Sequence, residues 1–150
     1  MSHLATLDHL FSNMPPVAAM QIRAVQFEGE VLHLSAPLAV NVNDKRCAFG
    51  GSLASLMTLA GWGWLMLKLR EAGVEAEVYV ADSKIRYLAP LYDDLQGEAM
   101  LRGDQDWPTI LRCLAERKRA RVTMLSDVRN AAGEPVATLE ARFALKQAIS

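Results

Sequence analysis

The stretch that decides the fold is residues 43–67, NDKRCAFGGSLASLMTLAGWGWLML. From Cys47 to Leu67 it carries no charged residue, and from Leu53 onward its apolar side chains point to every side of a helix. A helix of this kind must be surrounded by other apolar groups. The run is long enough to cross a membrane, but its glycines and its loop-like beginning favour a buried helix. We therefore predict one core helix that begins at Gly50-Gly51.

The segments around this helix have the patterns of short strands and amphipathic helices. Apolar residues at helical spacing predict a helix at 4–13, which Pro15-Pro16 stops. The remaining predicted elements are a hairpin of strands 20–26 and 31–36, strands 75–88 and 95–101, a short helix 107–117, and strands 121–128 and 135–145. This order predicts a single α+β domain over residues 1–150, with an antiparallel sheet of about five to six strands wrapped around the central helix.

The composition excludes several classes of protein. The 150 residues are 51% hydrophobic and 22% charged, with a formal net charge of -1. These values argue against a disordered chain and against nucleic acid as a partner. Cys47 and Cys113 are far apart and His3, His9 and His33 are scattered, so the sequence offers neither zinc-site spacing nor a nucleophilic triad. We expect no metal, no disulfide, no signal peptide and a cytoplasmic location.

Three motifs give the central helix a family context. The stretch NDKRCAFGGSLASL at 43–56 has an Asn six residues before the position preceding Gly-Gly, and AGWG at 60–63 and IRYLAP at 85–90 accompany it. Together they resemble the hot-dog thioesterases, most closely the YiiD C-terminal domain family, over residues 15–145. The resemblance implies a hot-dog fold, hydrolysis of an acyl thioester, and a site formed between two subunits.

The start of the central helix has the chemistry to polarise a carbonyl group. The first N–H groups of a helix lack intrahelical acceptors, and the helix dipole adds positive potential there. Gly51 is our candidate for the oxyanion contact, because a side chain at this position would block the approach of a thioester. Phe49, Gly50 and Ser52, which flank it, are candidates for binding the substrate. Asn43 either holds the attacking water, as the resemblance implies, or stabilises the loop through an Asx-turn.

The general base is harder to identify. In one branch of hot-dog thioesterases it is a carboxylate on the central helix, and the resemblance places Thr58 at that position. A threonine hydroxyl has no useful basicity near neutral pH. It could position a water, or bond back to a helix carbonyl. Asp44, in the loop before the helix, is one alternative, since another hot-dog branch carries its carboxylate there.

Asp82, in the strand predicted at 75–88, is the second candidate base. Strict alternation places Val78, Val80, Asp82, Lys84 and Arg86 on one face of this strand. An Asp in a strand of this kind needs a partner, and Lys84 would supply a structural ion pair. Lys84 and Arg86 are further candidates for binding the substrate.

These observations favour an acyl thioesterase that acts on acyl-CoA or on an acyl carrier protein, with coenzyme A only as part of the substrate. The alternative is a non-catalytic module of the same fold that binds acyl thioesters; a dehydratase is disfavoured because no histidine stands at the loop–helix junction. A basic cluster of Arg117, Lys118, Arg119 and Arg121 either meets nucleotide phosphates or is a solvated face. We expect a homodimer or a dimer of dimers, because an unpaired sheet edge favours association.

Overall fold

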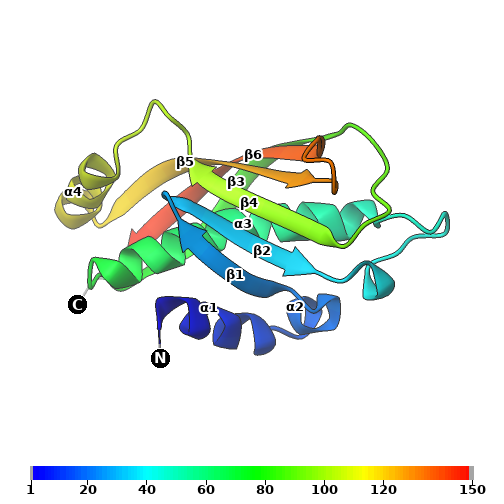
Figure 1. Ribbon diagram of the computed structural model, residues 1–150. Helices are drawn as coiled ribbons and strands as arrows, with labels where there is room; N and C mark the ends of the chain where they lie inside the picture. Colours follow the sequence, from blue (N-terminus) through cyan, green and yellow to red (C-terminus); the bar gives the residue numbers. More distant parts are fainter. Residues whose placement is uncertain (1, 149–150) are drawn as a thin grey trace.

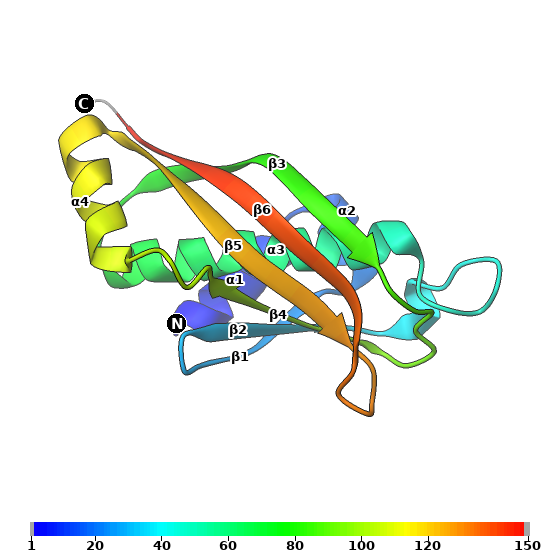
Figure 2. The same cartoon turned by 90° about the horizontal axis from the view of Figure 1, so that it is seen from above.

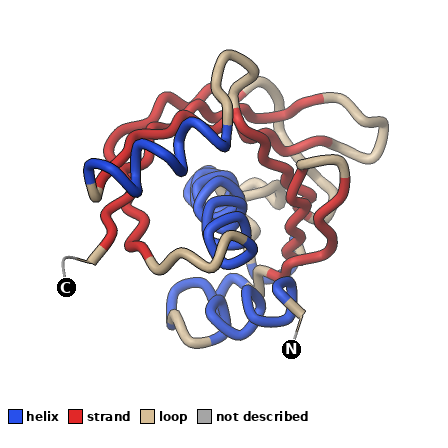
Figure 3. The backbone as a smooth tube through the Cα atoms, turned by 90° about the vertical axis from the view of Figure 1, so that its left-hand side faces the viewer, coloured by secondary structure: helices blue, strands red, loops and turns tan. Residues whose placement is uncertain are grey.

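The computed structural model describes residues 2–148, and they form one sheet curved around one long helix (Figure 1). The helix is α3, Gly50–Glu71, and the six antiparallel strands follow the spatial order β1-β2-β4-β5-β6-β3. Seen along α3, the strands curve over the helix, and helical backbone near the N-terminus lies below it (Figure 3). The predicted α+β architecture is confirmed.

The remaining elements agree closely with the predicted order. They are α1 (His3–Ser12), α2 (Pro15–Met20), β1 (Arg23–Glu28), β2 (Val31–Ala36), a 3-10 turn at Leu38–Val40, β3 (Ala76–Tyr87), β4 (Leu95–Leu101), α4 (Trp107–Arg117), β5 (Arg119–Arg129) and β6 (Pro135–Gln147). Viewed from above, β3 is the edge strand beside β6, and α4 lies near the C-terminus at the same end as the start of β3 (Figure 2).

Near the N-terminus the structure adds a helix that was not predicted and corrects the start of the first strand. The helix α1 does end before Pro15-Pro16, but these prolines begin the short helix α2, where proline is favoured because no N–H is needed in a first helical turn. Met20 therefore belongs to a helix, and the first strand begins at Arg23 instead of Met20.

The β1–β2 hairpin is joined to the central helix by Trp64. The hairpin turns at Gly29 and Glu30, which have φ angles of 58° and 62°, as a two-residue turn with two left-handed residues requires. The indole Nε1–H of Trp64 donates to the carbonyl of Glu30 at 2.9 Å, and Lys68 Nζ lies 2.9 Å from a carboxylate oxygen of Glu30. The edge of the Trp64 ring packs against Trp107 of α4, with ring centroids 5.5 Å apart.

The central helix is buried on most of its surface, but not on all of it. Leu56, Met57, Ala60 and Leu65 are fully buried among the strands. One stripe is only partly covered, and its members recur at helical spacing; they are Gly51, Ala54, Ser55, Thr58, Leu59, Trp62 and Met66. The sheet and α1 therefore leave a lengthwise stripe of α3 accessible, a feature that the all-round apolar sequence did not predict.

A bulge in β3 changes which of its side chains face the helix. Val80 pairs with the buried Phe143, but the register then shifts by one, and Asp82 pairs with Arg142 on the outer face. The predicted common face of Val80 and Asp82 is therefore wrong, because Ala81 interrupts the alternation.

No helix within residues 2–148 is both long enough and apolar enough to cross a membrane.

Candidate functional site

The start of α3 is open and carries unsatisfied donors. Its first residue follows Phe49, whose carbonyl accepts hydrogen bonds from the N–H groups of Ser52 and Leu53 at 3.0 and 3.1 Å. Within the described residues, the N–H groups of Gly50 and Gly51 form no hydrogen bond. Gly51 is exposed, so these two N–H groups and the positive end of the helix dipole are available to an external carbonyl oxygen.

The side chains around these two glycines lie very close to them. A Cβ atom built on Gly51 would meet Cε2 of Phe49 at 2.5 Å, so the Phe49 ring rests directly on this glycine. Tyr87, at the end of β3, donates from its hydroxyl to the carbonyl of Gly50 at 3.1 Å. Phe49 is 55% exposed, while the hydrogen bond of Tyr87 joins the end of β3 to the start of α3.

A cavity of about 360 Å³ opens beside Gly50. It lies between the start of α3 and residues 87–91, and Leu53, Tyr87 and Leu88 are among the residues that line it. Small-molecule sites have volumes in this range, and the open helix terminus thus adjoins a space where a reacting group can enter.

Asn43 holds the shape of the loop before α3. Its Oδ1 accepts from the N–H groups of Lys45 and Cys47 at 2.8 and 3.1 Å, and its Nδ2 lies 3.3 Å from the sulfur of Cys47. The geometry is that of the Asx-turn considered above. In this conformation the side chain is engaged within its own loop.

Asn41 is a residue that the sequence interpretation missed. It is 2% exposed, and its Nδ2 donates to the carbonyls of Met20 and Pro37 at 2.9 and 2.8 Å. Its own carbonyl accepts from the N–H of Phe49 at 2.7 Å. Asn41 therefore anchors the residue that precedes Gly50, and its Oδ1 is buried without a partner. The Asn-rich loop sequence was the available signal, but the spacing of the motif favoured Asn43 and gave no indication for Asn41.

The two proposed carboxylates lie in different surroundings. The Asp44 side chain is 80% exposed at the loop surface and its Oδ1 lies 3.2 Å from Lys45 Nζ. Asp82 lies on the outer face of the sheet and accepts from Nε of Arg142 at 2.8 and 3.1 Å. The hydrogen bond from Arg142 holds the pKa of Asp82 below its ordinary value. The predicted pair of Asp82 with Lys84 is wrong: the partner is Arg142, which the bulge brings opposite.

Thr58 uses its hydroxyl within the helix. Its Oγ1 donates to the carbonyl of Ala54 at 2.8 Å, which is the back-bonded geometry considered from the sequence. The side chain lies on the partly covered stripe that also includes Gly51. Seven residues separate the two, so they lie about 10 Å apart along the helix axis.

The remaining candidates are divided between the two faces of the sheet. Ser52 is 6% exposed, in the first turn of α3. Lys84 and Arg86 are exposed, opposite Glu140 and Thr138, and line a cavity of about 420 Å³ on the outer face. The structure therefore brings together Phe49, Gly50, Gly51 and Ser52, but it places Lys84, Arg86 and Asp82 away from them.

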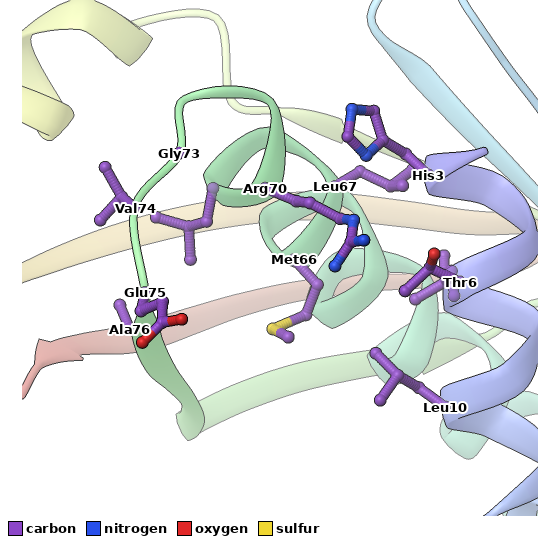
Figure 4. A pocket seen from close by; sticks show the side chains of 12 residues that line it. His3, Thr6, Leu10, Met66, Leu67, Arg70, Gly73, Val74, Glu75 and Ala76 are labelled. Atoms are coloured by element: carbon purple, nitrogen blue, oxygen red, sulfur yellow. The ribbon is translucent and has the colours of Figure 1, made fainter. Parts of the chain in front are cut away.

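A second apolar pocket lies at the opposite end of α3 (Figure 4). It has a volume of about 370 Å³ and lies between α1, the end of α3 and the start of β3. Leu10, Met66 and Val74 supply apolar walls, and Arg70 and His3 lie at the side of α1. Met66 also belongs to the partly covered stripe, so the stripe runs from the open helix start to this pocket.

Within residues 2–148, no group of three or more His, Cys, Asp or Glu side chains converges in a way that could hold a metal ion.

Comparisons with known proteins place this geometry in a family. Residues 4–147 match the family described as "Putative thioesterase (yiiD_Cterm)". A solved structure described as a "putative thioesterase" from Shewanella oneidensis is 28% identical, covers 97% of this chain and 98% of that chain, and superimposes with a TM-score of 0.86. A protein of unknown function from Chlorobaculum tepidum TLS is 25% identical, with coverage of 96% and 94% and a TM-score of 0.90. A Pseudomonas aeruginosa protein described as a "probable thioesterase" is 23% identical, with coverage of 96% and 95% and a TM-score of 0.81, and supports the hot-dog fold alone.

Proposed function

Since the chain belongs to the YiiD C-terminal family of thioesterases, we propose that it hydrolyses acyl thioesters at the start of α3. The observation that carries the proposal is the pair of unbonded N–H groups at Gly50 and Gly51, with a cavity beside Gly50 and the exposed ring of Phe49 against Gly51. A bound thioester carbonyl would accept a hydrogen bond from the Gly51 N–H. Attack by water would turn this carbonyl into a tetrahedral oxyanion, and its collapse would release the thiol and the carboxylic acid.

The energetic contribution of such a donor is large. Removing one oxyanion donor typically raises the barrier by about 2.7–4 kcal/mol, because the donor is already oriented toward the charge that develops. The Phe49 ring covers Gly51 in the structure. In our proposal it swings aside to admit the thioester and then shields the reacting carbon from bulk water.

The attacking water needs a base, and Asp44 is our first choice. Its ion pair with Lys45 is exposed and therefore weak, so the carboxylate is free to turn toward a substrate. Asp82 is a poorer base because Arg142 lowers its pKa, and it lies on the other face of the sheet. Asn43 would orient the water only if its bonds to Lys45 or Cys47 opened.

The acyl chain has an apolar path from the proposed reaction centre. The partly covered stripe of α3 passes Thr58 and Trp62 and reaches the apolar pocket at Met66. We propose that the chain follows this stripe. The distance along the helix from Gly51 to Met66 is about 22 Å.

We further propose that two copies associate through β3. This strand has twelve residues, pairs with β6 on one side only, and has exposed apolar side chains at Tyr79 and Val80. Long unpaired edges favour pairing with another chain, and a two-fold axis would make the two β3 strands antiparallel. The second copy would then lie along the uncovered side of α3 and close the acyl path.

A second candidate function is a module that binds acyl thioesters without hydrolysing them. Two observations favour it: the hydroxyl of Thr58 is used within the helix, and the pKa of Asp82 is lowered. Neither residue then acts as a base, and hydrolysis depends on Asp44.

The test compares two variants of Gly51, of which only one keeps the N–H group. Gly51→Ala adds a Cβ that displaces Phe49 but keeps the N–H, and so controls for added bulk; Gly51→Pro adds a ring and removes the N–H. Thiol release from acyl-CoAs of graded length should fall about 100-fold or more from Gly51→Ala to Gly51→Pro. Equal rates in the two variants would show that the oxyanion assignment is wrong. Tight binding of acyl-CoA without thiol release by the unmodified protein would support the binding module.

A further inference from the structure

A basic cleft lies at the end of the molecule opposite the start of α3. It has a volume of about 890 Å³, and it forms where the end of α4 meets the first residues of β5 and the last residues of β6. Five cationic side chains line it, together with one aromatic ring; they are Arg117, Lys118, Arg119, Arg121, Lys146 and Tyr79. Among residues 2–148, no acidic residue lines it. A concave surface of one sign concentrates anions more strongly than a flat one.

The cations of the cleft differ from most others in the chain because they have no acidic partner. Six of the sixteen lysines and arginines take part in ion pairs between described residues, and none of the five in the cleft is among them. On the outer face of the sheet, by contrast, Arg102, Arg129 and Arg142 are each paired with carboxylates. The charge of the cleft is therefore available to an external anion.

The register of the strands explains how the cleft is shaped. Arg119 is opposite Lys146, and Arg121 is opposite Ala144, which in turn is opposite Tyr79 of β3. Side chains opposite one another share a face of the sheet. The small Ala144 thus leaves a hollow with Arg121 on one side and the Tyr79 ring on the other.

Two further features point to a ligand with phosphates and a polar aromatic base. Lys118 has a φ of 62°, a left-handed backbone conformation that favours glycine. A lysine at this position therefore has a higher backbone free energy than a glycine would have. Tyr79, which is 53% exposed, offers a ring on which a base can stack.

The nearest acidic groups do not neutralise the cleft. Glu77 is opposite Lys146 and accepts a hydrogen bond from the Tyr79 hydroxyl, which fixes the ring beside the hollow. Asp82 is close enough to Arg121 for that charge to help lower its pKa, but its oxygens are bonded to Arg142. The end of the α4 dipole favours cations at Arg117 and Lys118, but it does not account for Arg121 and Lys146 on the strands.

We propose that this cleft binds the phosphorylated adenosine end of coenzyme A, so that acyl-CoA, and not an acyl carrier protein, is the substrate. An arginine side chain can donate two parallel hydrogen bonds to two oxygens of one phosphate. The volume of the cleft is in the range of small-molecule sites, whereas a protein partner would need a flatter surface. The inference rests on the proposed thioester hydrolysis for its biological role.

The association of two copies through β3, proposed above, places the cleft of one copy near the start of α3 in the other. In one chain Tyr79 and Tyr87 are eight residues apart on β3, so the cleft and Gly50 are separated by about 26 Å. In an antiparallel pair of β3 strands, the start of one β3 lies beside the end of the other. The cleft of one copy then lies at the same end of the joined sheet as the open helix start of its partner.

The binding test does not depend on hydrolysis. Adenosine 3′,5′-bisphosphate, titrated into the unmodified protein by calorimetry at low salt, should bind, and adenosine without phosphates should not. Arg121→Gln should weaken the binding about tenfold or more, because it removes a charged hydrogen-bond donor. Arg112→Gln is the matched control: Arg112 is on α4, outside the cleft, and has no ion pair among the described residues. Equal binding by the two variants would overturn the inference.

The catalytic test separates the two proposals. Arg121→Gln should lower kcat/KM for acyl-CoA about tenfold and leave kcat/KM for the matching acyl-pantetheine, which lacks the nucleotide, unchanged. Hydrolysis of both substrates at equal rates by the unmodified protein would refute the cleft and leave the thioesterase intact. Binding of the bisphosphate without any hydrolysis would support the cleft and refute the thioesterase. A preference for acyl carrier protein that Arg121→Gln removes would overturn the choice of coenzyme A.

Discussion

The two halves of α3 perform different tasks in the same helix. The C-terminal half is fixed by Trp64, which is 1% exposed, bonded to the Glu30 carbonyl and packed against Trp107. The N-terminal half begins with Gly50 and Gly51, whose N–H groups have no acceptor among the described residues. The difference teaches that one helix can combine a closely packed end with an end whose first N–H groups remain available to a ligand.

The largest effect should come from the fixed half. Trp64→Ala removes a buried ring and leaves a cavity, and it should lower the free energy of unfolding by about 3–5 kcal/mol. Trp62→Ala is the control, because Trp62 lies on the partly covered stripe and should cost less. Urea denaturation of both variants measures the difference. If Trp62→Ala were equally destabilising, the burial of Trp64 would not be what fixes this half of the helix.

The next effect should appear in activity and concerns the loop before the open half. Asp44→Asn should lower kcat by about 100-fold if Asp44 is the general base, because general bases contribute at least this much. Asp82→Asn should leave kcat within about threefold, since Arg142 holds the pKa of Asp82 low and makes it a weak base. Steady-state thiol release with one acyl-CoA decides between them. Normal turnover in both variants would exclude a carboxylate base at either position.

The smallest effect is expected at Thr58, in the middle of the helix. Thr58→Val keeps the shape and removes the hydroxyl that donates to Ala54. We expect kcat/KM to change by less than about threefold, because this hydroxyl is used within the helix. A tenfold loss with unchanged stability would instead show that Thr58 holds the attacking water, and the reactive part of α3 would then extend about two turns beyond Gly51.

Much of the fold could be predicted because its signals are local. The strands at Val31–Ala36 and Leu95–Leu101 and the helix Trp107–Arg117 have the predicted bounds, since alternation, helical spacing and Pro108 in a first turn depend on neighbouring residues only. The start of the central helix was predicted for the same reason, from the two glycines and the apolar run that follows.

The features that escaped prediction depend on contacts between distant segments. The partner of Asp82 is Arg142, sixty residues away, and only the pairing of β3 with β6 reveals the bulge that brings them together. The hydrogen bond from Tyr87 to Gly50 and the anchoring of Phe49 by Asn41 are likewise non-local. The residue types at the helix start could be identified from sequence, but the arrangement of the polar groups around it could not.

The bulge at Ala81 has a consequence for how this chain can vary in length. Before it, Val78 and Val80 face the helix; after it, Ser83 and Ile85 do, because the extra residue restores the alternation in the opposite phase. Loss of one residue here would turn Asp82 and Lys84 toward the core. The middle of β3 can therefore accept many substitutions. Insertion or deletion of a single residue there would instead turn every later side chain of the strand to the opposite face of the sheet, including Tyr87, which bonds to Gly50.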